Sequence, residues 1–130
     1  MTATVFEPSG QHVFADLYGI DADKLNNPSM VEQLLLDSAK AAGATILSSH
    51  FHTFGSEQGV TGVVLLAESH ISIHTWPEFG FAAVDIFMCG DSRPQRALEV
   101  MQLAFGATNS TVHTISRGCV KQPEKKNFSA

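Results

Sequence analysis

Residues 60–89 read VTGVVLLAESHISIHTWPEFGFAAVDIFMC, and this stretch decides the fold. Apolar side chains recur at every second position through residues 70–76 and 81–89, which is the period of a β-strand with one buried face. Residues 60–68 form a third run rich in valine and leucine, and the connection 77–80 contains the Pro and Gly typical of a hairpin loop. The stretch therefore predicts three consecutive antiparallel strands.

The flanking sequence predicts two helices and three more strands. An apolar stripe with helical period occupies residues 27–43, with proline near its first turn and glycine just past its end. A second stripe ends at Gly106 and is expected to begin near Asp91 or Ser92, both good helix caps. Strand periodicity recurs in residues 11–18, 44–54 and 111–116. The predicted fold class is α+β: a two-layer sandwich, mainly antiparallel sheet, with two helices on one face.

The composition predicts one domain, residues 1–130, with 44% hydrophobic residues and 8 basic against 13 acidic side chains. Lysines cluster only in the tail, residues 121–130, which is expected to be frayed and receives no function. Binding to nucleic acid needs a basic patch, so we expect no nucleic-acid partner. We therefore expect a binding site for a small molecule.

The chain carries no sign of export or of a membrane span. Residues 1–10 lack the basic and apolar regions of a signal peptide. The longest apolar run, Val63 to Ala67, is far shorter than the roughly 20 residues a membrane helix needs. Cys89 and Cys119 are too few for a disulfide-stapled secreted scaffold. We therefore expect a cytoplasmic protein with no membrane partner.

The alternation also predicts a polar and aromatic face on the side of the sheet away from the helices. Ile71 and Ile73 point to the core, so their neighbours point away from it. The side chains assigned to this open face are His50, His52, Phe54, His70, Ser72, His74, Trp76, Phe81, Asp85, Phe87 and Cys89. Such a face suits a dimer interface, a chemical site or zinc held by same-face histidine pairs. No matching carboxylate or cysteine set accompanies those pairs, so we expect no metal.

A longer pattern in the central stretch is similar to a known family. Residues 68–90, ESHISIHTWPEFGFAAVDIFMCG, closely resemble the processing and active-site stretch of the short prokaryotic, pyruvoyl-dependent S-adenosylmethionine decarboxylase proenzymes. Shorter matches follow the family's order: GQH at 10–12, AGATI at 42–46, FHTF at 51–54 and GVTGV at 59–63. The resemblance covers about residues 10–118.

The resemblance implies that the chain cuts itself between Glu68 and Ser69. Ser69 Oγ attacks the carbonyl carbon of Glu68 in an N-to-O acyl shift. Elimination from the resulting ester leaves a dehydroalanine, which hydrolyses to a pyruvoyl group at position 69 and ammonia. The products are a β chain, residues 1–68, and an α chain, residues 69–130. This pyruvoyl group is the implied cofactor, which forms a Schiff base with the amine of the substrate.

The resemblance assigns three assisting groups. His74 matches the family's processing histidine, which accepts the Cα proton of Ser69. Thr61 stands where the family often has Ser and supports processing as a hydrogen-bond donor to the developing oxyanion. Cys89 matches the family's proton donor in catalysis, and a thiol with a pKa of about 8.5 keeps its proton at neutral pH.

The implied substrate is S-adenosylmethionine. Phe54 and Trp76 offer aromatic faces for its adenine ring and its sulfonium, and Glu78 matches the family's acidic residue that holds the ribose hydroxyls. Asp16 is acidic where relatives often have Glu, and we assign it no role. The implied enzyme is a homodimer of αβ protomers that supplies decarboxylated S-adenosylmethionine for spermidine synthesis.

Two other functions stay open at this point. A pyruvoyl group requires only an α-amino acid, so an arginine or ornithine decarboxylase could use the same scaffold. Aromatic stacking and a ribose carboxylate favour the nucleoside substrate instead. A non-catalytic protein could use the histidine-rich face to bind a metal or a partner, and that protein would remain uncut.

Overall fold

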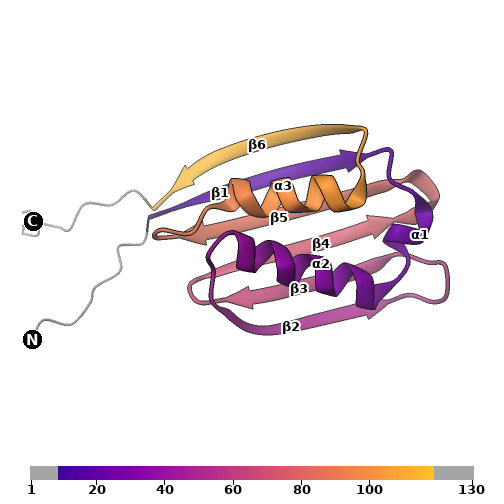
Figure 1. Cartoon of the computed structure of the whole chain (residues 1–130), viewed down its shortest axis with the longest axis horizontal. Coiled ribbons are helices and arrows are strands. Elements are labelled where there is room, and N and C mark those ends of the chain that lie inside the picture. Colours follow the sequence, from indigo (N-terminus) through magenta and orange to yellow (C-terminus); the bar gives the residue numbers. More distant parts are fainter. Residues whose placement is uncertain (1–8, 119–130) are drawn as a thin grey trace, which may run out of the picture.

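A six-stranded antiparallel sheet, in the order β2-β3-β4-β5-β1-β6, forms one layer of the computed structural model, which describes residues 9–118 (Figure 1). The strands are β1 (Gly10–Tyr18), β2 (Ile46–Thr53), β3 (Val60–Leu66), β4 (Ser69–Trp76), β5 (Phe81–Cys89) and β6 (Asn109–Arg117). The helices are α1 (Ala22–Leu25), α2 (Pro28–Ala41) and α3 (Pro94–Phe105), with a 3-10 turn, η1 (Pro77–Phe79). The predicted α+β sandwich is confirmed. The tail, residues 121–130, and Cys119 lie outside the described residues.

Helix α2 begins and ends where the sequence predicts. The Asn27 side chain accepts hydrogen bonds from the backbone N–H groups of Ser29 and Met30, at 3.1 and 3.3 Å. Pro28 occupies the first turn, where its missing N–H needs no partner. Gly43, with φ +80°, follows the last turn and allows the chain to leave the helix.

The predicted start of α3 near Asp91 or Ser92 is wrong. The N-cap is Arg93, whose side chain makes no capping hydrogen bond, and Pro94 is the first helical residue. A residue before proline is pushed to extended backbone, and Arg93 has φ −117° and ψ 92°. Proline therefore sets the boundary in place of a polar cap. The short helix α1 was not predicted, because four residues are too few to show a helical period.

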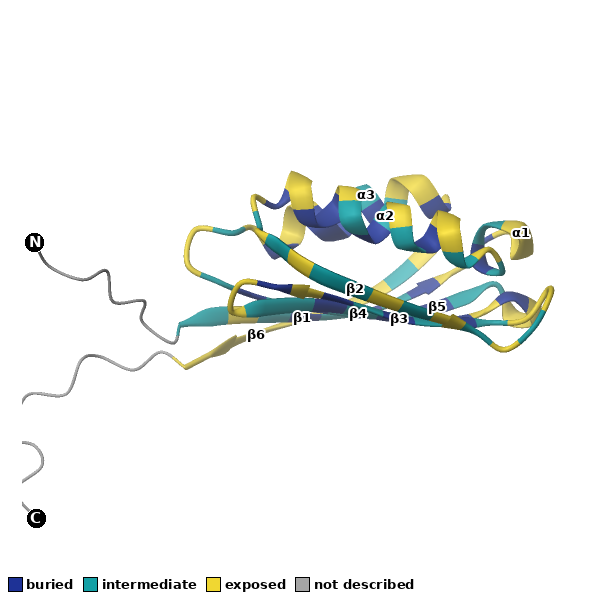
Figure 2. Ribbon diagram, turned by 90° about the horizontal axis from the view of Figure 1, so that it is seen from below, coloured by how far each residue is buried: buried dark blue, intermediate teal, exposed yellow. Residues whose placement is uncertain are grey.

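The core lies between the two long helices and one face of the sheet, and Figure 2 shows the helices covering that face only. The predicted alternation holds: Ile71 and Ile73 are fully buried beneath the helices. The Phe51 ring also turns to this side and lies directly over Gly62, where an added Cβ would come 2.1 Å from it. Within residues 9–118, nothing covers the opposite face of the sheet, and we call it the bare face (Figure 2). No described helix is long and apolar enough to span a membrane.

Thr75 ties the end of β4 to two other elements. Its hydroxyl is buried, donates to the carbonyl of Leu25 in α1 at 2.7 Å and accepts from the N–H of Val60 in β3 at 2.8 Å. His74 and Trp76 are its chain neighbours and therefore point to the bare face. This one hydroxyl thus holds the strand end that presents both side chains.

Thr75→Val is expected to lower the free energy of unfolding by about 2–4 kcal/mol, because it leaves a buried N–H and a buried carbonyl unpaired. The measurement is urea denaturation of the uncut Ser69→Ala chain at one protein concentration. Thr75→Ser is the matched control, since it keeps the hydroxyl, and it should lose clearly less stability than the valine variant. Equal losses would show that packing of the methyl group, rather than the hydrogen bonds, matters here.

Candidate active site

A two-residue connection, Ala67 and Glu68, joins β3 to β4. Leu66 pairs with Ser69 across it, so the strand ladder closes directly on the turn. Glu68 has a left-handed backbone, φ 58°, which is uncommon for a residue other than glycine. The N–H of Ala67 donates to the carbonyl of Thr45 at 2.9 Å. The predicted cleavage pair therefore lies in a tight, anchored turn.

Ser69 and Cys89 meet at this end of the sheet, although they come from different strands. The backbone N–H of Cys89 donates to Ser69 Oγ at 3.2 Å. Glu68 and Cys89 line a hollow whose other walls are Ser9, Gly43, Thr45, Ala67, Gly90, Asp91 and Ser92. We call Glu68, Ser69 and Cys89 the cleavage end.

The Cys89 thiol is held in its protonated form. Burial raises its pKa above the ordinary value, and the negative charge of Glu68 adds to the rise. A thiol in this position is neutral at physiological pH and has a proton to give. A protonated thiol is the state required by the proton-donor role that the sequence predicts for Cys89.

A second group gathers at the other end of the same strands. Thr61 on β3 pairs directly with His74 on β4, and Thr61 Oγ1 lies 3.1 Å from His74 Nδ1. Phe54 and Trp76 are 63% and 40% exposed, so both side chains can meet a ligand from outside the chain, and the Phe81 ring lies 5.3 Å from that of Trp76. Phe54, Thr61, His74, Trp76 and Glu78 line one hollow, and we call these five residues the aromatic end.

The two ends are far apart within one chain. Ser69 and His74 are five residues apart on β4, which spans about 16 Å at the rise of a β-strand. His74 Nδ1 and Thr61 are therefore out of reach of the Cα proton and carbonyl that the sequence assigned to them in the same chain. The structure brings the predicted site residues together as two sets rather than one.

Sequence reasoning did not include His12 among the site residues. Its Nε2 lies 3.6 Å from Asp85 Oδ1, and its ring contacts those of Phe14 and Phe87 at centroid distances of 4.2 and 5.7 Å. Burial lowers the His12 pKa below the ordinary value, although the charge of Asp85 opposes this shift. The alternation in residues 11–18 was the signal that places His12 on the same face as Asp85.

The histidines of the bare face pack against aromatic rings. His52 lies edge-on to Phe54 at 5.0 Å, and His70 contacts Phe87 at 6.0 Å. Within residues 9–118, no three His, Cys, Asp or Glu side chains come close enough to hold a metal ion.

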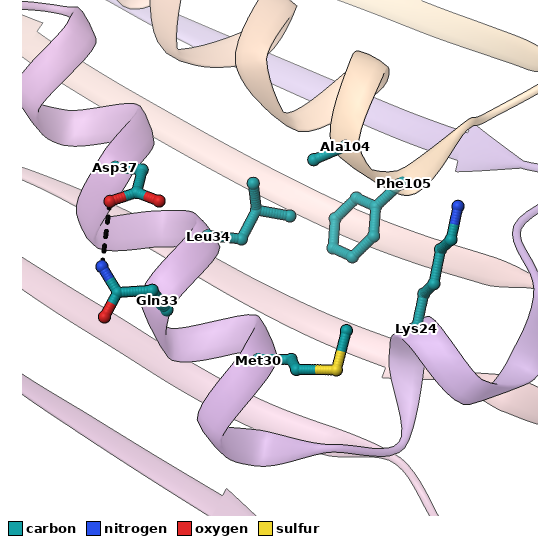
Figure 3. Close-up of a pocket in the computed structure, with 7 residues that line it drawn as sticks. All are labelled: Lys24, Met30, Gln33, Leu34, Asp37, Ala104 and Phe105. Atoms are coloured by element: carbon teal, nitrogen blue, oxygen red, sulfur yellow. Dashed lines mark hydrogen bonds between the residues drawn. The ribbon is translucent and has the colours of Figure 1, made fainter.

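A separate hollow lies on the helix side, between α2 and α3 (Figure 3). Met30, Leu34 and Phe105 give it an apolar lining, with Lys24 at its rim. Gln33 and Asp37 bond to each other at 2.9 Å along one side. None of the residues predicted for the site line this hollow, so it is separate from the candidate site.

Comparisons with known proteins show the family of this chain. The sequence matches the S-adenosylmethionine decarboxylase family over residues 11–118. The chain belongs to this family. The S-adenosylmethionine decarboxylase proenzyme of Clostridium kluyveri is 47% identical over 114 residues, which cover 87% of this chain and 90% of that protein. The proenzyme of Acetivibrio thermocellus is 44% identical over 117 residues, covering 89% and 94%.

A solved structure extends the agreement to the fold. The adenosylmethionine decarboxylase from Aquifex aeolicus superposes with a TM-score of 0.81 at 41% identity, covering 94% of this chain and 98% of that one. The S-adenosylmethionine decarboxylase family assignment predicted from the sequence is confirmed, and with it the expectation of an enzyme made as a proenzyme. Family membership favours this function over the arginine, ornithine and non-catalytic alternatives.

The lowered pKa of His12 predicts that acid weakens the fold. Below about pH 6.5 the unfolded chain binds a proton at this position more readily than the folded chain, so stability falls as the pH drops from 7.5 to 5.5. His12→Gln in the uncut Ser69→Ala chain should flatten this fall, measured as the unfolding temperature against pH. His113→Gln, on the exposed strand β6, is the control. An unchanged slope in the His12 variant would assign the acid sensitivity to other groups.

Proposed function

We propose that this chain is the proenzyme of a pyruvoyl-dependent enzyme that decarboxylates S-adenosylmethionine, releasing CO2 and supplying decarboxylated S-adenosylmethionine for spermidine synthesis. The observation that carries the proposal is the Ser69 hydroxyl, held by the Cys89 N–H at 3.2 Å directly after a left-handed residue in a two-residue turn. Membership in the family, whose curated relatives are named as proenzymes, supports it.

Cleavage follows from the placement of Ser69. Its Oγ belongs to the residue whose own nitrogen is acylated by Glu68, so the attacking atom is near that carbonyl without any diffusion. The N–H of Cys89 donates to Ser69 Oγ and so orients the attacking oxygen. The products are the β chain, residues 1–68, and the α chain, residues 69–130. The pyruvoyl group formed from Ser69 supplies the electron sink for decarboxylation.

Cys89 fits the role of proton donor in catalysis. Its backbone already contacts residue 69, so its thiol belongs to the neighbourhood of the reacting carbon. Burial and the Glu68 charge keep that thiol protonated. Because the chemistry needs a free thiol, we place the enzyme in the reducing cytoplasm.

We further propose that two copies form the complete site. The cleavage end lacks the predicted processing histidine, His74, and the Phe54 and Trp76 rings predicted for the substrate, and the aromatic end lacks the nucleophile. In such a homodimer the two bare faces would pack together about a two-fold axis that runs across the strands near Ser72. The β4 strands of the two protomers would then run in opposite directions. The cleavage end of one protomer would then lie opposite His74, Thr61 and the aromatic end of its partner.

The aromatic end suits the nucleoside part of the substrate. Phe54 and Trp76 present exposed ring faces for stacking with adenine and for attraction of the sulfonium. Glu78 lines the same hollow, and its two oxygens can accept from two ribose hydroxyls. We propose no partner beyond S-adenosylmethionine and the second protomer, and neither nucleic acid nor a membrane.

Cys89→Ala separates the two reactions. The variant keeps the backbone N–H that contacts Ser69 Oγ, so the chain should still be cut into residues 1–68 and 69–130. Decarboxylation, measured as labelled CO2 from carboxyl-labelled S-adenosylmethionine, should fall by about 10²–10⁴-fold, the range for a lost general acid. Ser69→Ala should give one uncut chain with no activity, and Cys119→Ala serves as the cysteine control. Full activity in the Cys89 variant would remove the thiol from the mechanism, and release of CO2 from arginine or ornithine alone would reassign the substrate.

Mixed dimers test the shared site. Ser69→Ala and Glu78→Ala are each expected to be inactive alone, but a dimer holding one of each contains one site with no defect. Random pairing of the two co-expressed chains should therefore restore about a quarter of the wild-type activity. Co-expression of Ser69→Ala with a Ser69→Ala/Glu78→Ala double variant is the control. Absence of recovery, with mixed dimers shown to form, would place the whole site in one chain.

A further inference from the structure

We propose that the left-handed backbone of Glu68 drives the self-cleavage, because strain held in the β3–β4 turn is released as the acyl group moves from nitrogen to oxygen. The inference rests on the proposed cleavage between Glu68 and Ser69. It makes Glu68 a positioning residue whose backbone conformation, rather than its carboxylate, sets the rate.

The backbone conformation of the turn is unfavourable both for its residues and for the twist of the two strands that it joins. Of its two residues, only the second, Glu68, has positive φ. This sign pattern is that of a type II turn, which favours glycine at its second central position. Two-residue hairpins prefer types I′ and II′, whose twist matches that of the strands. A side chain at φ 58° and a mismatched twist both raise the energy of the uncut turn.

The surrounding contacts prevent the turn from relaxing. The Ala67 N–H is bonded to Thr45 on one side, and Leu66 pairs with Ser69 beneath it. On the other side, the Cys89 N–H holds the Ser69 hydroxyl. A strained conformation persists only where its neighbours fix it in this way.

The acyl shift relieves this constraint. A bond forms between the Glu68 carbonyl carbon and Ser69 Oγ, the bond from that carbon to the Ser69 nitrogen breaks, and the hydroxyl proton passes to the released amine. The link from the Glu68 carbonyl carbon to the Ser69 Cα then runs through oxygen and Cβ instead of nitrogen alone. The connection is one atom longer, so Glu68 can leave the left-handed region. An ester is less stable than an amide, and the released strain offsets part of that difference.

The chain contains a matched control for this conformation. Glu57, in the loop between β2 and β3, has the same side chain and nearly the same backbone angle, φ 63°. That loop is closed by a hydrogen bond from the Gln58 N–H to the Gly55 carbonyl at 3.1 Å, and it lies at the opposite end of the sheet from the scissile bond of its own chain. A change at Glu57 therefore alters the same kind of strain without altering the cleavage turn.

The test follows cleavage of the full chain after a short pulse of labelled cell-free synthesis. Samples are quenched in denaturant over time, and the first-order rate of conversion to the two fragments is measured. Glu68→Gln keeps the side-chain length and the strained backbone without the charge, and it is the reference. Glu68→Asn and Glu68→Gly ease the left-handed conformation, so both should cleave more slowly than the reference, the glycine variant by about tenfold. Glu57→Gly should cleave at the wild-type rate.

Stability provides a second readout that does not depend on cleavage. In the uncut Ser69→Ala chain, Glu68→Gly should raise the unfolding temperature by a few degrees, because it removes the cost of positive φ. Asn and Gly variants that cleave as fast as the Gln reference, a Glu57 variant that is slowed equally, or a lowered unfolding temperature would each overturn the inference. Wild-type fragments whose masses do not correspond to a cut between Glu68 and Ser69 would instead overturn the proposed function.

Discussion

The two-residue connection between β3 and β4 is the constraint on which the rest of the structure depends. By pairing Leu66 with Ser69, it fixes the register that sets Thr61 opposite His74 at the far end of the same hairpin. A slip of one residue would turn every side chain of β4 to the other face, exposing Ile71 and Ile73 and burying His74. The tight turn therefore aligns both halves of the candidate site, although they lie at opposite ends of the strand.

Burial and charge act together at the cleavage end. The carboxylate of Glu68 lies close enough to Cys89 to raise the pKa of its thiol, in the same direction as burial does. Cleavage would turn Glu68 into a chain terminus and add a second negative charge near that thiol. In the proposed mechanism, the processing step would thus reinforce the protonated state that Cys89 needs as proton donor, and Glu68 would link the maturation of the protein with its chemistry.

Much of the fold was predictable because its periodicities are strong. The alternation in β4 and β5 correctly placed Ile71 on the helix side of the sheet and His74 on the bare face, and the helical stripe of α2 was correct to within its caps. The start of α3 was not, because Pro94 overrides the capping preference of Asp91. The sequence pattern also named the site residues as one set. Periodicity gives the face of the sheet on which a residue lies. The division of the site residues between the cleavage end and the aromatic end becomes visible only when distances along β4 are measured.

This division gives a physical reason for assembly. The bare face carries exposed aromatic rings and partly buried polar groups such as His12, whose Nε2 has no hydrogen-bond partner among the described residues. A monomer would leave this face in water, whereas a second copy would cover it and supply each end with the groups it lacks. In that arrangement, the same surface stabilises the dimer and completes the site. Self-cleavage would then depend on contact with the partner, and a protomer would become an enzyme only after it had assembled.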